Sequence, residues 1–209
     1  MRTNEHSDLA YDSKERFVSY WHQINEIIKL NPNNILEIGV GTRFVSRYLK
    51  ERNFKIITAD INLHLKSDLL ANILNLPFKD KQFEAISCCQ VLEHLPYEFF
   101  ENALAELYRV SRSYVILSLP DASMVYPIFI KIPGFEALKS LIPVPGYLIP
   151  ANGHDYHYWE IGQKRYPLKI ISKIILQRGF TISKTFRPFE YYYHRFFILK
   201  KTEITEMTK

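Results

Sequence analysis

The sequence feature that most constrains this chain is residues 35–42, ILEIGVGT, where an apolar run meets a glycine-containing turn. Such a run is typical of a strand that is buried on both faces, as in a parallel sheet. Gly39 and Gly41 let the backbone bend sharply and let a ligand approach it closely. Apolar residues at helical spacing follow at once, from Phe44 to Leu49. This strand–turn–helix order predicts a small-molecule site at the turn, and a purely structural turn is the alternative.

The side chains around the turn indicate which kind of ligand fits. A dinucleotide-binding turn has glycine at its first, third and sixth positions, but the sixth position here is Phe44. Its ring would obstruct the close approach of a pyrophosphate, and Glu37 would repel one. A carboxylate at the end of the strand instead favours a ligand with a positive group. S-adenosylmethionine, with its ammonium and sulfonium and no phosphate, meets this requirement.

A second acidic residue supports nucleoside binding. Residues 55–60, KIITAD, form a short apolar run that ends in Asp60. This residue follows the glycines by about 20 positions, the usual spacing of a carboxylate that accepts hydrogen bonds from ribose hydroxyls. Dinucleotides and S-adenosylmethionine share this spacing, so it does not distinguish them. The alternative is a surface aspartate at the start of a loop.

Two further stretches complete a family pattern. Residues 72–78, NILNLPF, precede 83–86, FEAI, and residues 90–95, QVLEHL, lead into 107–110, LYRV. Together with residues 35–42, they resemble the class I S-adenosylmethionine-dependent methyltransferases, specifically the methyltransferase type 11 group, over about residues 35–120. The chain departs from that pattern at two positions. Arg43 stands where the family often has a third glycine, and Asn72 where it often has an acid near the adenine amino group.

The resemblance implies an α/β fold of the Rossmann-like kind. It is a three-layer sandwich around a seven-stranded, mostly parallel sheet of order 3-2-1-4-5-7-6 with an antiparallel last strand. It also implies S-adenosylmethionine as the cofactor and S-adenosylhomocysteine as the product. Glu37 would face the methionine ammonium, Asp60 the ribose, and Asn72 the adenine. The cofactor-binding residues implied in this way are Glu37, Gly39, Gly41, Thr42, Asp60, Asn72, Ile73 and Gln90.

The periodicity of the whole chain agrees with such a fold. It predicts helices over 12–30, 97–110 and 167–178, and strands near 34–39, 54–60, 84–89, 114–119, 180–187 and 194–200. The last two strands lack room for a crossover helix, which predicts an antiparallel pair. In the first helix, Asp12 and Glu15 suggest a capping box. Its predicted buried stripe comprises Phe17, Trp21, Ile24 and Ile28.

The chain is expected to form a single domain over 1–209, with a helical segment at 1–31 and an insert at 121–160. Five prolines interrupt the insert, so a long regular helix is not expected there. Its many apolar residues suggest a lid over an apolar or amphipathic acceptor. A flap that packs on the core and a peripheral membrane contact are the alternatives.

Histidines supply the candidate catalytic residues. Residues 152–160, NGHDYHYWE, offer His154 and His157 as a general base or as acceptor-binding groups. His94 follows the fourth strand near the expected transfer site, although it could simply cap the next helix. His154, Asp155 and His157 are all potential metal ligands. Their spacing matches no strong zinc signature and no fourth ligand is evident, so no metal is predicted.

Charge and composition limit the partners. The formal net charge is +5, and residues 160–209 hold 11 Lys and Arg against 4 Asp and Glu. A basic face of this kind could attract RNA, anionic lipid or a phosphorylated carrier, or it could be a solvated surface. No RNA-binding module accompanies it, so nucleic acid is not the expected partner. No signal peptide or membrane span is recognisable, and the adjacent Cys88 and Cys89 suggest a reduced, cytoplasmic protein.

These observations predict an S-adenosylmethionine-dependent methyltransferase (EC 2.1.1.-) acting on a small-molecule or lipid-/glycan-linked acceptor. The Asn/Asp-Pro-Pro-Tyr signature of many amino-group methyltransferases is absent after the fourth strand, where residues 88–91 read CCQV. The alternatives are a non-catalytic S-adenosylmethionine-binding protein and an RNA methyltransferase. No pattern indicates an oligomeric state.

Overall fold

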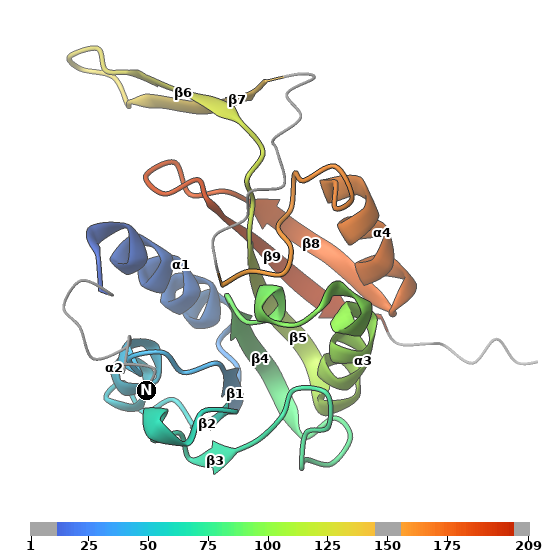
Figure 1. Cartoon of the computed structure of the whole chain (residues 1–209). Helices are drawn as coiled ribbons and strands as arrows, with labels where there is room; N and C mark the ends of the chain where they lie inside the picture. Colours follow the sequence, from blue (N-terminus) through green and yellow to red (C-terminus); the bar gives the residue numbers. More distant parts are fainter. Residues whose placement is uncertain (1–11, 145–155, 203–209) are drawn as a thin grey trace, which may run out of the picture.

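A seven-stranded sheet forms the centre of the computed structural model, which describes residues 12–144 and 156–202 (Figure 1). Its strand order is β3-β2-β1-β4-β5-β9-β8. All neighbouring strands pair in parallel except β9, which is antiparallel to both β5 and β8. The predicted sheet order and antiparallel final pair are therefore confirmed. The strands are β1 (Ile35–Ile38), β2 (Ile56–Asp60), β3 (Leu69–Leu70), β4 (Phe83–Cys89), β5 (Ser111–Pro120), β8 (Phe180–Phe186) and β9 (His194–Lys201).

Helices cover both faces of the sheet and create two apolar cores (Figure 1). Side chains alternate across the strands, so Ile35 packs in one core and its neighbour Leu36 in the other. Cys88 and Cys89 likewise face opposite cores as free thiols. The α-helices are α1 (Lys14–Leu30), α2 (Phe44–Lys50), α3 (Phe100–Val110) and α4 (Leu168–Gln177). Short 3₁₀ turns are η2 (Leu63–Leu65), η3 (Leu92–His94) and η4 (Tyr97–Phe99).

Helix α1 buries a different face from the one predicted. Of the expected apolar stripe only Ile24 is buried, whereas Phe17, Trp21 and Ile28 are 43%, 59% and 42% exposed. The buried face is mixed and comprises Ser19, Tyr20, Gln23, Ile24, Glu26 and Ile27. Three of these residues, Ser19, Tyr20 and Gln23, line the large cavity described below. The helix therefore covers a polar site as well as the core, which a count of apolar residues cannot detect.

The N-terminal cap of α1 also differs from the prediction. The Ser13 hydroxyl accepts a hydrogen bond from the Arg16 backbone N–H at 3.4 Å, so Ser13 and not Asp12 is the N-cap. The Asp12 carboxylate instead accepts a hydrogen bond from the Tyr20 hydroxyl at 2.9 Å. The other predicted helices lie where expected, although the first turn of the 97–110 helix is the 3₁₀ turn η4.

The insert after β5 contains a two-stranded antiparallel hairpin formed by β6 (Val125–Ile130) and β7 (Leu138–Pro143). The hairpin stands away from the main sheet (Figure 1). The two ends of the insert meet at the sheet, because Asp121 forms a bridge with Ile161. Trp159 is fully buried beside Tyr97 and Phe100, which anchors the returning end. None of the described helices is both long and apolar enough to cross a membrane.

Candidate functional site

A large cavity lies at the carboxyl ends of β1, β2 and β4, where open α/β sheets bind their ligands. Its volume is about 820 Å³, which is within the range of small-molecule sites. Of the eight predicted cofactor-binding residues, only Thr42 is not in its lining. The seven that line it are Glu37, Gly39, Gly41, Asp60, Asn72, Ile73 and Gln90.

The turn after β1 requires glycine at position 39 for a steric reason. Gly39 has a φ of +80°, and a Cβ there would lie 2.3 Å from a methyl carbon of Val91. Arg43, at the position of the family's third glycine, also adopts a left-handed φ of 62°. Such a conformation costs a non-glycine residue roughly 1–2 kcal/mol. The chain thus keeps the backbone course of a glycine-rich turn without the third glycine.

Glu37 presents a buried carboxylate to the cavity. The residue is only 4% exposed, and its Oε2 atom has no hydrogen-bond partner among the described residues. Burial raises the pKa of the Glu37 carboxyl to about 8, although the Ser46 side chain and Lys50 oppose the shift. A buried carboxylate with one oxygen lacking a partner is costly when ionised, so a cationic ligand group beside that oxygen would be favoured.

Asp60 is held in place by backbone donors. Its Oδ2 atom accepts from the Val40 N–H at 2.9 Å, and its Oδ1 atom accepts from the Asn62 N–H at 2.8 Å. The first bond ties the end of β2 to the glycine turn. A carboxylate oxygen has a second lone pair, so each atom retains an acceptor position for a hydroxyl group.

Asn72 and Gln90 mark two other parts of the cavity wall. The Asn72 side-chain oxygen accepts from the Leu74 N–H at 2.9 Å, which fixes the turn that carries Ile73. Gln90, directly after β4, has a left-handed φ of 56°. With its amide nitrogen facing the neighbouring acceptors, it donates to Glu93 Oε1 at 3.2 Å and to His194 Nε2 at 3.1 Å. These contacts place Gln90 between two ends of the cavity. One is the glycine-turn end, with Glu37 and Asp60, and the other is the histidine-rich end, with His94, His157 and His194.

The histidine-rich end unites segments that are far apart in the sequence. His94 comes from η3 and His157 from the end of the insert, and their ring centroids lie 5.1 Å apart. His94 Nδ1 lies 3.0 Å from the Tyr156 carbonyl oxygen. His157 Nδ1 lies 2.8 Å from the Glu160 carboxylate, which also accepts from the Tyr193 hydroxyl at 2.6 Å. His94 and His157 both line the cavity.

Two residues of this end were not recognised from the sequence. Glu93 is fully buried beneath the cavity, and burial raises the pKa of its carboxyl to about 8. His194, at the start of β9, is buried with its Nδ1 atom 2.9 Å from the Ser19 hydroxyl. Burial lowers the pKa of His194 to about 3, so this imidazole is neutral. The third predicted catalytic residue, His154, lies outside the described residues.

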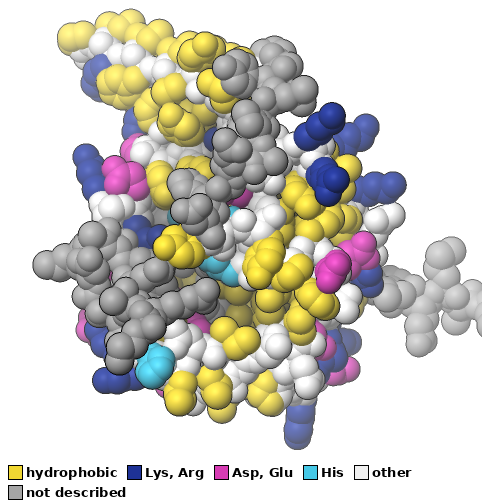
Figure 2. Space-filling view, viewed as in Figure 1, with side chains coloured by type: hydrophobic (Ala, Val, Ile, Leu, Met, Phe, Trp, Pro, Cys, Tyr) yellow, Lys and Arg dark blue, Asp and Glu magenta, His cyan; other side chains and the backbone are white. Residues whose placement is uncertain are grey.

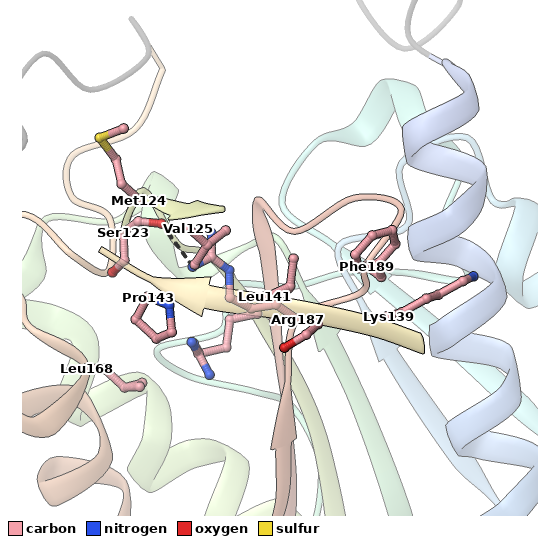
Figure 3. A pocket seen from close by; sticks show the side chains of 11 residues that line it. Ser123, Met124, Val125, Lys139, Leu141, Pro143, Leu168, Arg187 and Phe189 are labelled. Atoms are coloured by element: carbon pink, nitrogen blue, oxygen red, sulfur yellow. Dashed lines mark hydrogen bonds between the residues drawn. The ribbon is translucent and has the colours of Figure 1, made fainter. Parts of the chain in front are cut away.

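A second cavity, of about 540 Å³, lies beneath the hairpin (Figure 3). Its cationic side chains are already engaged. Arg187 donates to the carbonyl oxygens of Ser123 and Asp121 at 2.9 and 3.0 Å, and Lys139 is paired with Glu190 at 2.5 Å. The Arg187 bonds attach the base of the hairpin to the body of the protein, and the Lys139–Glu190 pair attaches its outer part, so this cavity has a structural explanation.

Comparison with known proteins assigns the chain to a family. Residues 36–118 match the model of a methyltransferase domain. An uncharacterised protein of Methanocaldococcus jannaschii is 30% identical over 158 residues, which cover 69% of this chain and 68% of that protein. The chain belongs to the class I S-adenosylmethionine-dependent methyltransferases.

Two more comparisons place this methyltransferase among its relatives. A tRNA U34 carboxymethyltransferase of Nautilia profundicola is 30% identical over 105 residues, covering 43% of this chain and 35% of that protein. Among solved structures, the 1,6-didemethyltoxoflavin-N1-methyltransferase of Burkholderia thailandensis, crystallised with its substrate and S-adenosylhomocysteine, shares the fold. Its TM-score is 0.64 at 11% identity, over 95% of this chain and 83% of that one.

S-adenosylmethionine is the cofactor of this family, and the methyltransferase presents residues that fit it. The unpartnered oxygen of Glu37 suits the ammonium group, and the two anchored oxygens of Asp60 suit hydroxyl groups. The cofactor supplies an activated methyl group on its sulfonium. The protein's own contribution is to bind and orient it, so that the methyl carbon faces a nucleophile.

Proposed function

We propose that the protein transfers the methyl group of S-adenosylmethionine to a small-molecule or lipid-/glycan-linked acceptor bound at the histidine-rich end of the cavity. One observation carries this proposal: a single cavity contains Glu37 and Asp60 at one end and His94 and His157 at the other. A cofactor bound on the glycine turn would direct its methyl group towards Gln90 and the histidines. The acceptor would enter past Tyr156 and Tyr158, which lie in the same wall.

The histidine-rich end can also prepare an acceptor hydroxyl for attack. Because a carbonyl oxygen only accepts, His94 Nδ1 carries a proton and the lone pair of the neutral ring is on Nε2. Glu160 orients His157 in the same way. A neutral imidazole with an oriented lone pair is a suitable general base or ligand near neutral pH.

The first experiment separates enzyme from binding protein. S-adenosylhomocysteine should raise the melting temperature, because binding at 100 times the dissociation constant adds about 2.7 kcal/mol to folding stability. Radiolabelled S-adenosylmethionine should then label a small-molecule or lipid extract but not bulk tRNA. Label only in tRNA would overturn the proposal in favour of the RNA activity suggested by the Nautilia relative. Binding without transfer to any of these fractions would favour the non-catalytic alternative.

The exposed apolar residues of the hairpin favour a lipid-linked acceptor over a small soluble molecule. Figure 2 shows an apolar surface over much of it. Because successive strand residues point to opposite faces, Phe129 lies on one face of β6 and Tyr126 and Ile130 on the other. These three side chains are 56%, 63% and 47% exposed, and Phe135 in the connecting loop is 70% exposed. The Phe129 face turns towards the body of the protein, because the Phe129 and Phe189 ring centroids lie 6.4 Å apart and the cross-strand partner Lys139 lines the second cavity. The outward face, with Tyr126 and Ile130, and the loop residue Phe135 therefore form the surface that a lipid bilayer could receive.

The energetics agree with reversible attachment to a membrane. Each fully buried aromatic or aliphatic side chain contributes about 1.5–3 kcal/mol, so burying the exposed parts of Tyr126, Ile130 and Phe135 contributes roughly 3–5 kcal/mol, which is enough for weak, reversible attachment. Lys131 lies next to the loop and would favour an anionic surface. The described hairpin residues do not line the large cavity. The predicted role of the insert as a lid over the acceptor therefore stays a prediction.

Vesicle flotation tests this attachment. The protein should float with phosphatidylcholine vesicles containing phosphatidylglycerol, and the double variant Tyr126→Ser/Phe135→Ser should remain in the soluble fraction. Trp21→Ser is the matched control, because Trp21 is an equally exposed aromatic residue on α1. Equal flotation of wild type and double variant, or no flotation of the wild type, would leave a small-molecule acceptor as the proposal.

A further inference from the structure

Three side chains with metal-binding atoms converge at the histidine-rich end of the cavity. Glu93 and His94 come from η3, and His157 comes from the distant end of the insert. One ligand atom of each side chain lies within 4.8 Å of the ligand atoms of the other two. Ligand atoms bound to one tetrahedral ion at about 2.1 Å lie about 3.4 Å apart, so side-chain rotations that draw the three groups closer together would bring all of them to one ion.

Glu93 supplies an independent indication of a cation. Its side chain is completely buried, and its Oε2 atom has no hydrogen-bond partner among the described residues. The other oxygen faces the Gln90 amide. Burial of an ionised carboxylate is destabilising by several kcal/mol unless a cation or further donors compensate, and here only one of the two oxygens has a donor. A metal ion beside Oε2 would supply the missing positive charge.

The two histidines are held as metal-binding histidines usually are. In known metal sites the second ring nitrogen commonly donates to a carboxylate or a backbone carbonyl, which fixes the tautomer and the ring orientation. His157 Nδ1 bonds to the buried Glu160, and His94 Nδ1 bonds to the Tyr156 carbonyl. Glu160 is itself held by the Tyr193 hydroxyl. Each ring therefore carries its lone pair on Nε2.

We propose that Glu93, His94 and His157 form a binding site for a divalent transition-metal ion at the acceptor end of the cavity. Two imidazoles and one carboxylate are a ligand set used by zinc and by non-haem iron. Three protein ligands leave further coordination positions open, which is the arrangement of a catalytic rather than a structural site. The sequence analysis named His157 as a potential ligand but grouped it with its neighbours His154 and Asp155, because Glu93 and His94 are distant along the chain.

The site would select an acceptor with an oxygen donor. This consequence rests on the proposed methyl transfer. A hydroxyl group bound at an open position loses its proton to water more readily, because the ion stabilises the oxygen anion. That oxygen then forms the bond to the methyl carbon as the carbon–sulfur bond breaks. The bonding pair remains on sulfur, and neutral S-adenosylhomocysteine leaves.

A cobalt titration tests the site without any acceptor. The full chain, stripped with a chelator, should bind one equivalent of Co²⁺ and develop visible absorption bands, with a dissociation constant below about 10 µM. Glu93→Gln, His94→Gln and His157→Gln should each weaken binding at least tenfold. Glu160→Gln should weaken it 10- to 100-fold through the orientation of His157. The control is His64→Gln, which alters an exposed histidine on η2 and should leave binding unchanged.

Retained stabilisation by S-adenosylhomocysteine identifies the variants that are folded. Cobalt binding that none of the three ligand variants weakens would overturn the site and assign the metal to other histidines. Absence of saturable binding by Co²⁺ and Zn²⁺ would also overturn it. Radiolabel transfer by the metal-free protein would remove the metal from the reaction and leave the proposed methyltransferase function intact.

Discussion

The buried Glu37 carboxyl makes the stability of the ligand-free protein depend on pH in a predictable direction. Its pKa is about 8 in the folded protein, against 4.5 for an unperturbed glutamate, because burial disfavours the charged form. Between these values the folded state holds one proton that the unfolded state has released. The free energy of unfolding therefore falls as pH rises through this window, by about 1.4 kcal/mol per pH unit.

Replacement of Glu37 by glutamine should remove this dependence. Over the whole window the contribution of the one carboxyl is on the order of 5 kcal/mol. Other titrating groups are common to both proteins, so they cancel in the comparison. Urea unfolding at pH 5 and pH 8 should show the Glu37→Gln variant gaining several kcal/mol on the wild type between the two pH values. Glu51→Gln, at the exposed end of α2, is the matched control and should follow the wild type.

The same variant should bind the cofactor product more weakly. The S-adenosylhomocysteine ammonium beside an ionised Glu37 would make a charge-assisted hydrogen bond worth about 1.5–3 kcal/mol, so affinity should fall at least tenfold. Calorimetry in buffers of different ionisation enthalpy should show proton release on binding at pH 7 in the wild type but not in the variant. Identical pH slopes in the two proteins, together with equal affinities, would refute this account of Glu37.

Three further substitutions probe the scaffold and the site. In urea unfolding, Gly39→Ala should destabilise the fold more than Gly134→Ala does. Both glycines have positive φ, but only a Cβ at position 39 would collide with a neighbour, Val91. Equal effects would contradict the steric argument. Asp60→Ala should lower both folding stability and S-adenosylhomocysteine affinity by about 1 kcal/mol or more, since it loses two backbone bonds as well as a ribose partner; unchanged calorimetric affinity would exclude the ribose role. Trp159→Ala should cost about 3–5 kcal/mol in folding stability, and a loss under 1 kcal/mol would show that the end of the insert is not anchored by it.

The sequence was most informative for features that depend only on residues close together along the chain. Residues 35–42 predicted a buried strand followed by a turn, and β1 is buried along its whole length. Glu37 and Asp60 line the cavity, while their binding of the cofactor stays a prediction. Local signals of this kind depend on side-chain alternation and on glycine, both of which can be read from neighbouring residues.

The histidine-rich end could be predicted only in part, because its residues meet through tertiary structure. His94 and His157 were recognised as chemically reactive types, but nothing in the sequence places them 5.1 Å apart. His194 begins a strand and gave no signal at all. Helix α1 was misjudged for a related reason: Gln23 is buried because it faces the cavity, and polar burial has no apolar periodicity.

The bridge between Asp121 and Ile161 has a consequence for how such an enzyme can diversify. The backbone leaves the sheet and rejoins it at adjacent points, so the segment between Asp121 and Ile161 is an insertion whose two ends are held together by the sheet. A chimaera that carries a different segment but keeps the anchoring Trp159 should therefore fold around the same cofactor-binding part of the sheet. Substrate choice in proteins built this way can change by wholesale exchange of one segment, without any alteration to the machinery that holds the methyl donor.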